Sequence, residues 1–149
     1  MNEQKLKQDL IRDEGVVLNA YRDSLGYLTI GVGRLIDPEK GGKISQAEAE
    51  LMLHNDVLHV QVLLDKYLPW WRKLSEVRQR ALANMAFNLG VGPSPDEPEG
   101  KLLNFKNTLK AMEAGDYEAA AKGMGASLWA TQVGPRAQRL IYMMREDKE

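Results

Sequence analysis

The 149-residue chain contains no cysteine and only two histidines, His54 and His59. The lack of cysteine excludes disulfide bonds, thiol nucleophiles and zinc sites built on cysteine. The two histidines are five positions apart on a predicted helix and share no face well, so we expect no metal site and no cofactor. A chain of this length buries about 70% of its unfolded surface on folding, and therefore needs neither cross-links nor a structural metal.

The chain also lacks an excess of charge of either sign and any long apolar run. Its 20 Lys+Arg balance 21 Asp+Glu for a formal net charge of −1, which gives no overall attraction to nucleic acid or to an acidic membrane surface. No apolar run approaches the roughly 20 residues that cross a bilayer, and the first nine residues lack the layout of a signal peptide. We therefore expect a soluble protein made in a cytoplasm, with no nucleic-acid partner and no stable membrane insertion.

The first third of the chain changes from helical to β-type patterning and back. Apolar spacing predicts a first helix that ends near Glu14 and Gly15. Residues 16–34 are rich in β-forming side chains punctuated by glycines, which predicts a small hairpin or three-stranded sheet. The segment SQAE at 45–48 is a capping box, and it predicts a long helix running to about Leu68.

The rest of the chain is predicted to be helical. Ser75 can cap a helix that Gly90 ends, and Asn104 can cap another that runs through Met112. Two more helices are predicted, one over residues 117–124 and one that begins with Pro135 in its first turn.

Together these patterns predict an α+β fold within a single domain, 1–149. It comprises a small N-terminal β-sheet lobe and a larger helical lobe, roughly 12–60 and 61–149, which the long helix joins. Loops are predicted around Pro38 and Gly41–Gly42 and over Gly92–Gly100. The second of these, acidic and proline-rich, is expected to be a solvated surface segment.

Two carboxylates stand in contrasting predicted environments. Glu14 lies where a helix gives way to the β segment and is followed by glycine and apolar residues, whereas Asp23 lies in a turn between two β-like runs. A carboxyl group beside apolar surface has its neutral form favoured, as a general acid requires, while a solvated turn keeps a carboxylate ionised. Glycosidases divide acid from base or nucleophile in this way, although helix ends and turns are also ordinary positions for Glu and Asp.

These residues lie within a longer pattern. Glu14, Asp23 and Thr29 follow the spacing Glu, eight residues, Asp, five residues, Thr, and Thr29 lies in the glycine-rich run GYLTIGVG at 26–33. This segment resembles the active-site segment of the T-even-type phage lysozymes, glycoside hydrolase family 24. The resemblance continues over nearly the whole chain, at residues 80–90, 105–109 and 127–139.

The resemblance implies a lysozyme-like fold, with the N-terminal helix packing on the helical lobe, and an endo-acting muramidase. Such an enzyme hydrolyses the β-1,4 bond between N-acetylmuramic acid and N-acetylglucosamine in peptidoglycan. Glu14 is then the general acid, Asp23 faces the anomeric carbon, and Thr29 shares with Asp23 the water that attacks. That arrangement implies inversion, for which the carboxyl groups lie roughly 6.5–9.5 Å apart.

The resemblance also implies a set of substrate-binding residues: Leu35, Phe87, Thr108, Gln132 and Arg136. From the residues alone, Leu35 and Phe87 are as well explained as core positions, and Arg136 as a solvated cation at a helix start. Arg34 stands where well-known family members carry His, and we expect it to pair with an acid on the long helix, such as Asp56.

The glycan strands of peptidoglycan are the implied substrate, and the protein is expected to be a monomer. The family implies release by a holin, so that the protein stays in the host cytoplasm until it reaches the periplasmic wall. Two alternatives remain open. One is a lysozyme domain of a phage tail or secretion apparatus, and the other is a catalytically silent peptidoglycan-binding protein.

Overall fold

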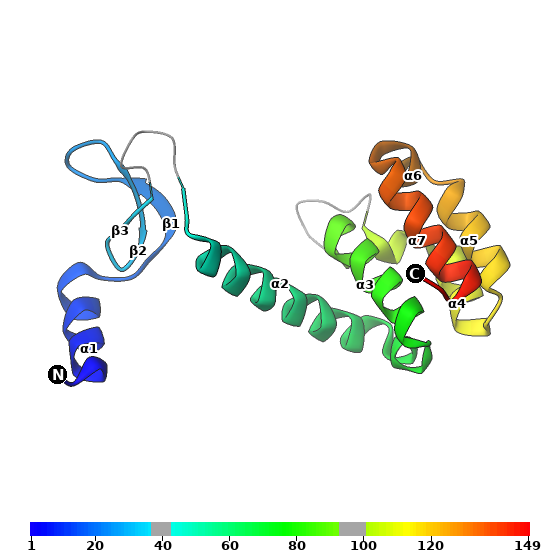
Figure 1. Cartoon of the computed structure of the whole chain (residues 1–149), viewed down its shortest axis with the longest axis horizontal. Helices are drawn as coiled ribbons and strands as arrows, with labels where there is room; N and C mark the ends of the chain where they lie inside the picture. Colours follow the sequence, from blue (N-terminus) through cyan, green and yellow to red (C-terminus); the bar gives the residue numbers. More distant parts are fainter. Residues whose placement is uncertain (37–42, 93–100) are drawn as a thin grey trace. The chain divides into compact units, whose positions relative to one another are not determined.

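The computed structural model describes residues 1–36, 43–92 and 101–149. Their contacts divide the chain into two units, Met1–Leu51 and Met52–Glu149. The described residues form seven α-helices, two 3-10 helices and one three-stranded antiparallel sheet (Figure 1). This content confirms the predicted α+β fold. The single domain, the lobe boundary near residue 60 and the packing of the first helix on the helical lobe stay predictions, and residues 37–42 and 93–100 of the two predicted loops lie outside the described residues.

The N-terminal unit begins with helix α1, Glu3–Glu14, as its sequence predicted. The side chain of Asn2 caps it by accepting a hydrogen bond from the backbone N–H of Lys5 at 3.0 Å. The helix ends at Gly15, whose φ of +73° is a backbone conformation that favours glycine. Glu14 is therefore fixed as the last helical residue.

The sheet confirms the three-stranded alternative. Its strands are β1 (Val17–Arg22), β2 (Leu28–Gly31) and β3 (Arg34–Leu35), in the order β1-β2-β3. In the central strand, Thr29 is paired with Tyr21 on one side and with Leu35 on the other. Thr29 is 5% exposed and is the one buried residue described in this unit.

Helix α2, Gln46–Tyr67, begins at the predicted capping box. Ser45 Oγ accepts from the Glu48 N–H at 3.3 Å, and the Glu48 carboxylate accepts from the Ser45 N–H at 2.8 Å. Arg34 donates to the same carboxylate at 2.9 Å, so the acid it meets on the long helix is Glu48, and the predicted pairing with Asp56 was wrong. Bonds from the Ser45 hydroxyl and N–H, and then the Arg34 charge, lower the pKa of Glu48.

The second unit continues from α2 into a helical bundle. Its elements are η1 (Pro69–Lys73), α3 (Glu76–Leu89), η2 (Leu102–Asn104), α4 (Lys106–Ala114), α5 (Tyr117–Gly125), α6 (Leu128–Val133) and α7 (Pro135–Glu146). Ser75 caps α3 and Gly90 ends it, as predicted. The prediction that Asn104 caps the next helix was wrong, because α4 begins at Lys106 with Phe105 at the capping position. Helix α6 was not predicted.

The hydrophobic core lies in this second unit. Helix α3 contributes Ala81, Leu82, Met85 and Ala86, all fully buried. Helix α7 packs on α3, α5 and α6. Because every helix of the bundle buries an apolar face here, this unit has the packed interior that stabilises a domain.

A cation joins three of these helices. The guanidinium of Arg78 on α3 lies 3.5 Å from the ring centroid of Tyr117 on α5. It also donates to the carbonyl of Met144 at 2.9 Å and pairs with Asp147 at 3.1 Å, at the C-terminal end of α7. Ser75, at the start of α3, donates to the same Asp147 carboxylate. A cation at a helix C-terminus is electrostatically favourable, so Arg78 stabilises the end of α7.

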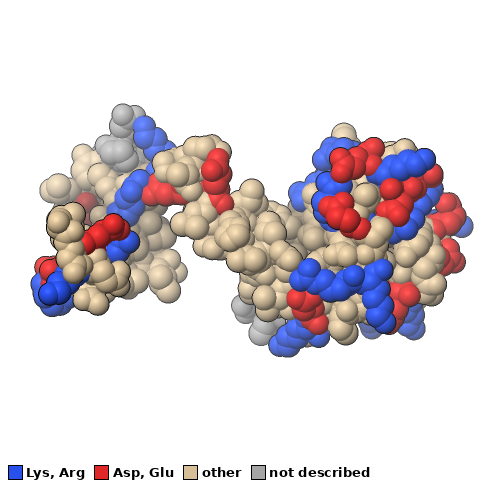
Figure 2. All heavy atoms as spheres, turned by 60° about the horizontal axis from the view of Figure 1, so that its bottom comes forward, with Lys and Arg blue, Asp and Glu red and all other residues tan. Residues whose placement is uncertain are grey.

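Within residues 1–36, 43–92 and 101–149, no helix is both long enough and apolar enough to cross a membrane. Acidic and basic side chains are interspersed over the face of the helical unit that Figure 2 shows, in keeping with the near-zero net charge.

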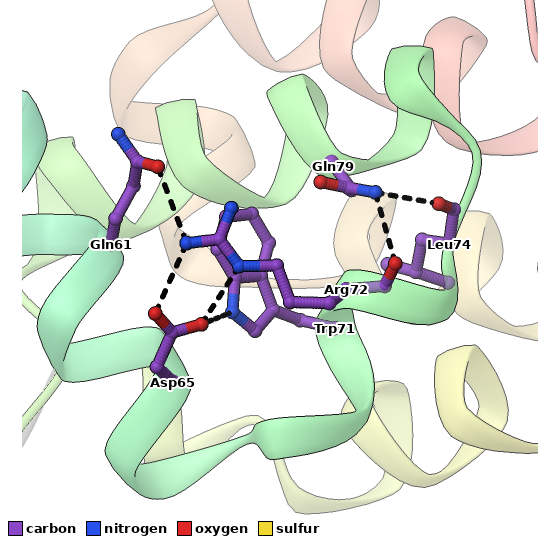
Figure 3. Close-up of polar contacts among 6 residues, drawn as sticks. All are labelled: Gln61, Asp65, Trp71, Arg72, Leu74 and Gln79. Carbon is purple, nitrogen blue, oxygen red and sulfur yellow. Dashed lines mark hydrogen bonds and ion pairs between the residues drawn. The ribbon is translucent and has the colours of Figure 1, made fainter.

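The junction between α2 and α3 is held by one carboxylate (Figure 3). Asp65 accepts hydrogen bonds from Trp71 Nε1 at 2.7 Å and from Arg72 at 2.8 and 3.0 Å. The Arg72 guanidinium lies 4.1 Å from the centroid of the Trp71 ring, which is 3% exposed. Trp71 is therefore a packing residue of the bend.

We predict that this junction makes the free energy of unfolding depend on pH in the acid range. Hydrogen bonds first from Arg72 and then from Trp71 lower the pKa of Asp65. The carboxylate therefore stabilises the fold at pH values above its pKa in the unfolded chain, about 3.9. This stabilisation is lost as the pH falls through the lower pKa of the folded state. Urea unfolding of Asp65→Asn should show a smaller loss of stability between pH 6 and pH 3 than wild type.

The matched control is Glu113→Gln, because Glu113 is exposed and makes no hydrogen bond or ion pair with the described residues. Its unfolding curve should follow wild type at both pH values. Equal acid sensitivity in wild type and Asp65→Asn would contradict the role given to Asp65.

Candidate functional site

The carboxyl group of Glu14 lies against the turn between β2 and β3. A Cβ atom placed on Gly33 in that turn would come within 3.0 Å of Glu14 Oε2. Gly33 also has a φ of +65°, so both the backbone conformation and the close approach require glycine. The end of α1 and the far end of β2 are thereby brought together at one carboxylate.

The predicted apolar shielding of Glu14 is absent from its own unit. The residue is exposed, and the apolar residues that follow it, Val16, Val17 and Leu18, are exposed as well. The expectation of desolvation by these neighbours was therefore wrong.

Asp23 closes the turn between β1 and β2. Its Oδ1 atom accepts hydrogen bonds from the N–H groups of Leu25 and Tyr27, each at 2.9 Å. Its own N–H donates to the Tyr27 carbonyl at 2.9 Å. Aspartate is favoured in such turns because its short side chain bonds the backbone two residues on. Oδ2 accepts no hydrogen bond from the described residues, so one oxygen of the carboxylate remains available.

Thr29 lies one residue into β2 and is bonded to the same turn. Its hydroxyl donates to the Tyr27 carbonyl at 3.4 Å, a long hydrogen bond. Tyr27 thus bonds both Asp23 and Thr29 through its backbone. We assigned no role to Tyr27 from the sequence. Its position between Asp23 and Thr29 was the signal that could have indicated one.

The three predicted catalytic residues therefore lie in one unit, with Thr29 in the sheet, Asp23 in its first turn and Glu14 at the end of α1. Asp23 is at the start of β2 and Glu14 is at its end, and this strand has four residues. An inverting glycosidase needs two such carboxyl groups, far enough apart to leave room for a water molecule between them.

The predicted substrate-binding residues fall in both units. Leu35 is exposed on β3, and Gln132 is exposed on α6. Phe87 and Arg136 line one hollow of about 420 Å³ in the helical unit, together with Asn84. Gln132 does not line it, so the structure brings together only two of the five predicted residues.

Arg136 is oriented by Asn84. Its guanidinium donates to Asn84 Oδ1 at 2.7 and 2.9 Å and to the Asn84 carbonyl at 3.2 Å. We assigned Asn84 no role from the sequence, although an exposed amide among the apolar residues of α3 was a possible signal. A guanidinium held by three hydrogen bonds is fixed in direction and still presents unused N–H groups.

Thr108 is placed in the core and not on a cleft wall. It is 7% exposed, at the contact between α4 and α5. A Cβ atom on Gly123 would come within 2.3 Å of Thr108 Oγ1, so the glycine permits the close approach of the two helices. Its side chain is used in helix packing, and the prediction that Thr108 contacts substrate stays a prediction.

This contact predicts a stability effect with a rescue. Gly123→Ala should destabilise the protein by about 1–3 kcal/mol, the usual cost of overpacking. Thr108→Ala removes the clashing hydroxyl, so the double variant Thr108→Ala/Gly123→Ala should recover most of that loss in urea unfolding. Additive losses in the double variant would show that the two residues do not compete for the same space.

No group of three or more His, Cys, Asp or Glu side chains capable of holding a metal ion occurs in residues 1–36, 43–92 and 101–149.

The chain is similar to several known proteins. A family model described as phage lysozyme matches residues 12–147. The chain is 34% identical to the pre-baseplate central spike protein Gp5 of Enterobacteria phage T4, over 91% of this chain and 26% of that protein. It is 28% identical to probable T4-type lysozyme 1 of Dictyostelium discoideum, over 93% of this chain and 92% of that protein. It is also 29% identical to the SAR-endolysin of Escherichia phage Mu, over 83% of this chain and 66% of that protein. The chain thus spans about a quarter of the spike protein and most of the Dictyostelium lysozyme.

Proposed function

The chain belongs to the phage lysozyme family, and from that premise we propose that it is a muramidase that acts on bacterial peptidoglycan. The bond it hydrolyses is the β-1,4 linkage between N-acetylmuramic acid and N-acetylglucosamine. The family supports a lysozyme-type glycoside hydrolase, and the bond and the residues are our assignment.

One observation carries this proposal. Two carboxyl groups lie at opposite ends of a four-residue strand, one against Gly33 and the other in the turn that Tyr27 closes. Each has an oxygen atom open to a ligand, since Glu14 is exposed and Asp23 Oδ2 accepts no bond from the described residues. Glycoside hydrolysis by a carboxyl pair needs two separate carboxyl groups that are both available to the substrate.

In the proposed mechanism, Glu14 is the general acid. Its protonated carboxyl group donates a proton to the glycosidic oxygen as the bond to the anomeric carbon breaks. The leaving sugar departs as an alcohol, and Glu14 is left as a carboxylate. Its position against a glycine backbone allows a sugar ring to approach without a side chain in the way.

Asp23 activates the attacking water. Its Oδ1 is held by two N–H donors, so the carboxylate is fixed in direction and Oδ2 accepts a proton from the water. The hydroxyl of Thr29, bonded to the same Tyr27, provides a second polar contact for that water. Attack from the face opposite the leaving group inverts the anomeric carbon in a single displacement.

We predict that Glu14→Gln loses most activity while keeping the fold. Removing the proton donor should lower the rate by about 10²–10⁴-fold, the usual contribution of general acid catalysis. The measurement is release of new reducing ends from purified Gram-negative peptidoglycan, with circular dichroism to verify folding. The matched control is Asp13→Asn, which changes the adjacent acid, paired with Arg12, and should keep wild-type activity.

Two outcomes would contradict the proposal in different ways. Equal activity in wild type and Glu14→Gln would remove Glu14 from the mechanism while leaving a hydrolase. No new reducing ends from wild type, with wall binding retained, would identify a catalytically silent peptidoglycan-binding protein.

For delivery, we propose a free endolysin that is held in the host cytoplasm and reaches the wall when a holin opens the inner membrane. The similarity to endolysins supports a free lytic enzyme, and the cytoplasmic stage and the holin step are our assignment. A second route, a lysozyme unit within a phage particle, is supported by the similarity to a phage spike protein, of which this chain matches 26%. A lysozyme unit carried on a phage particle would purify with the tails, whereas a free endolysin would stay in the host lysate.

A further inference from the structure

A second hollow in the helical unit is lined by two polar side chains that make no hydrogen bond or ion pair with the described residues of this unit. It has a volume of about 280 Å³ and lies between α2 and α3. Asp56 and His59 come from α2, and Phe87 and Gly90 come from α3 and its end. All its lining residues belong to residues 52–149, so the hollow is a property of one unit.

Asp56 and His59 lie three residues apart on one face of α2. Residues at this spacing on a helix are neighbours. Both are exposed, and neither makes a hydrogen bond or ion pair with the other described residues of this unit. A carboxylate provides acceptors, and a neutral imidazole provides one donor and one acceptor. The rim of the hollow can therefore both donate to and accept from hydroxyl and amide groups.

The floor of the hollow is apolar and carries an open aromatic ring. Phe87 is 43% exposed, although its neighbours on α3, Met85 and Ala86, are fully buried. Val91 is 1% exposed and lines the hollow together with Val60 and Leu63. An aromatic face beside directed hydrogen-bonding groups suits a ligand that has one apolar face and a polar edge.

In the neighbouring hollow, which shares Phe87 and Val60, the charged side chains already have partners within the protein. Of its charged residues, Arg80 pairs with Glu76 and Glu149, and Arg136 is bonded to Asn84. The hollow at His59 is also the smaller of the two, below the roughly 300–1,000 Å³ of sites for drug-sized ligands. Its size suits a single sugar ring.

We propose that His59 and Asp56 hydrogen-bond one N-acetylhexosamine ring of the glycan strand while that ring stacks on Phe87. The inference rests on the proposed function, because it names a subsite for the same polysaccharide. The CH face of the sugar covers the aromatic ring, and its hydroxyl and acetamido groups meet the imidazole and carboxylate. His59 and Asp56 are then determinants of substrate binding and take no part in proton transfer.

The two histidines of the chain provide a matched pair of variants. His54 lies five positions before His59 on α2, is exposed, and does not line the hollow. His59→Ala should raise KM for solubilised glycan strands by about five-fold, as expected for one lost hydrogen bond, with kcat within two-fold of wild type. His54→Ala should match wild type in both constants, and Asp56→Asn should also raise KM.

A second measurement needs no variant. Histidine side-chain NMR signals of the full wild-type chain are followed during titration with tri-N-acetylchitotriose, and His59→Ala serves to assign the two sets. The His59 signals should shift with saturation while those of His54 stay in place. Unchanged signals from both histidines, or equal shifts in both, would overturn the proposal, as would an unchanged KM in folded His59→Ala.

Failure of this proposal is distinguishable from failure of the proposed function. Wild-type release of reducing ends with an unresponsive His59 contradicts the subsite and leaves the muramidase intact. Absence of new reducing ends contradicts the function, and the NMR titration then decides by itself whether the hollow binds the sugar.

Discussion

The β1–β2 turn depends on a single carboxylate oxygen. Asp23 Oδ1 accepts the N–H groups of Leu25 and Tyr27, and these bonds fix the start of the central strand. Because strand pairing sets the register from that point, the positions of Thr29 and of the glycine-rich turn after β2 follow from it. The same carboxylate keeps its other oxygen available. The residue that organises the turn is therefore already held in a fixed direction, so less conformational entropy is lost when it is positioned for the reaction.

The helical unit obtains its rigidity in a different way. Its stability comes from a continuous apolar core around α3, reinforced by charged groups at the ends of helices, such as Asp65 at the α2–α3 junction and Arg78 at the end of α7. These groups have their bonds within the protein. Asp56 and His59 differ in making none with the described residues of their unit, and they lie beside an aromatic ring that is partly exposed. Such polar groups on a rigid helix can bond the polar groups of a ligand without breaking hydrogen bonds within the protein.

Local sequence signals predicted the elements well, because the physics of those elements is local. The capping box at 45–48, the cap at Ser75 and the glycines that end α1 and α3 each act within a few residues. Asp23 and Thr29 are likewise close because one hairpin holds both of them, and Glu14 lies in the same unit.

Predictions that needed long-range packing were less successful. Arg34 met Glu48 and not Asp56, and Thr108 lies buried because Gly123 lets two helices approach closely. The partner of Arg136 was also missed, because Asn84 is separated from it by 52 positions along the chain. Such contacts depend on how helices pack, which no pattern within one segment encodes.

The central claim is that two carboxyl groups act through a water molecule in a single displacement. The anomeric form of the first product tests it most directly, measured by ¹H NMR within seconds of adding enzyme to soluble glycan strands. The account predicts that the newly formed reducing end is initially the α-anomer, which then mutarotates. An initial β-anomer would show a double displacement through a covalent intermediate, and would contradict the role given to Asp23.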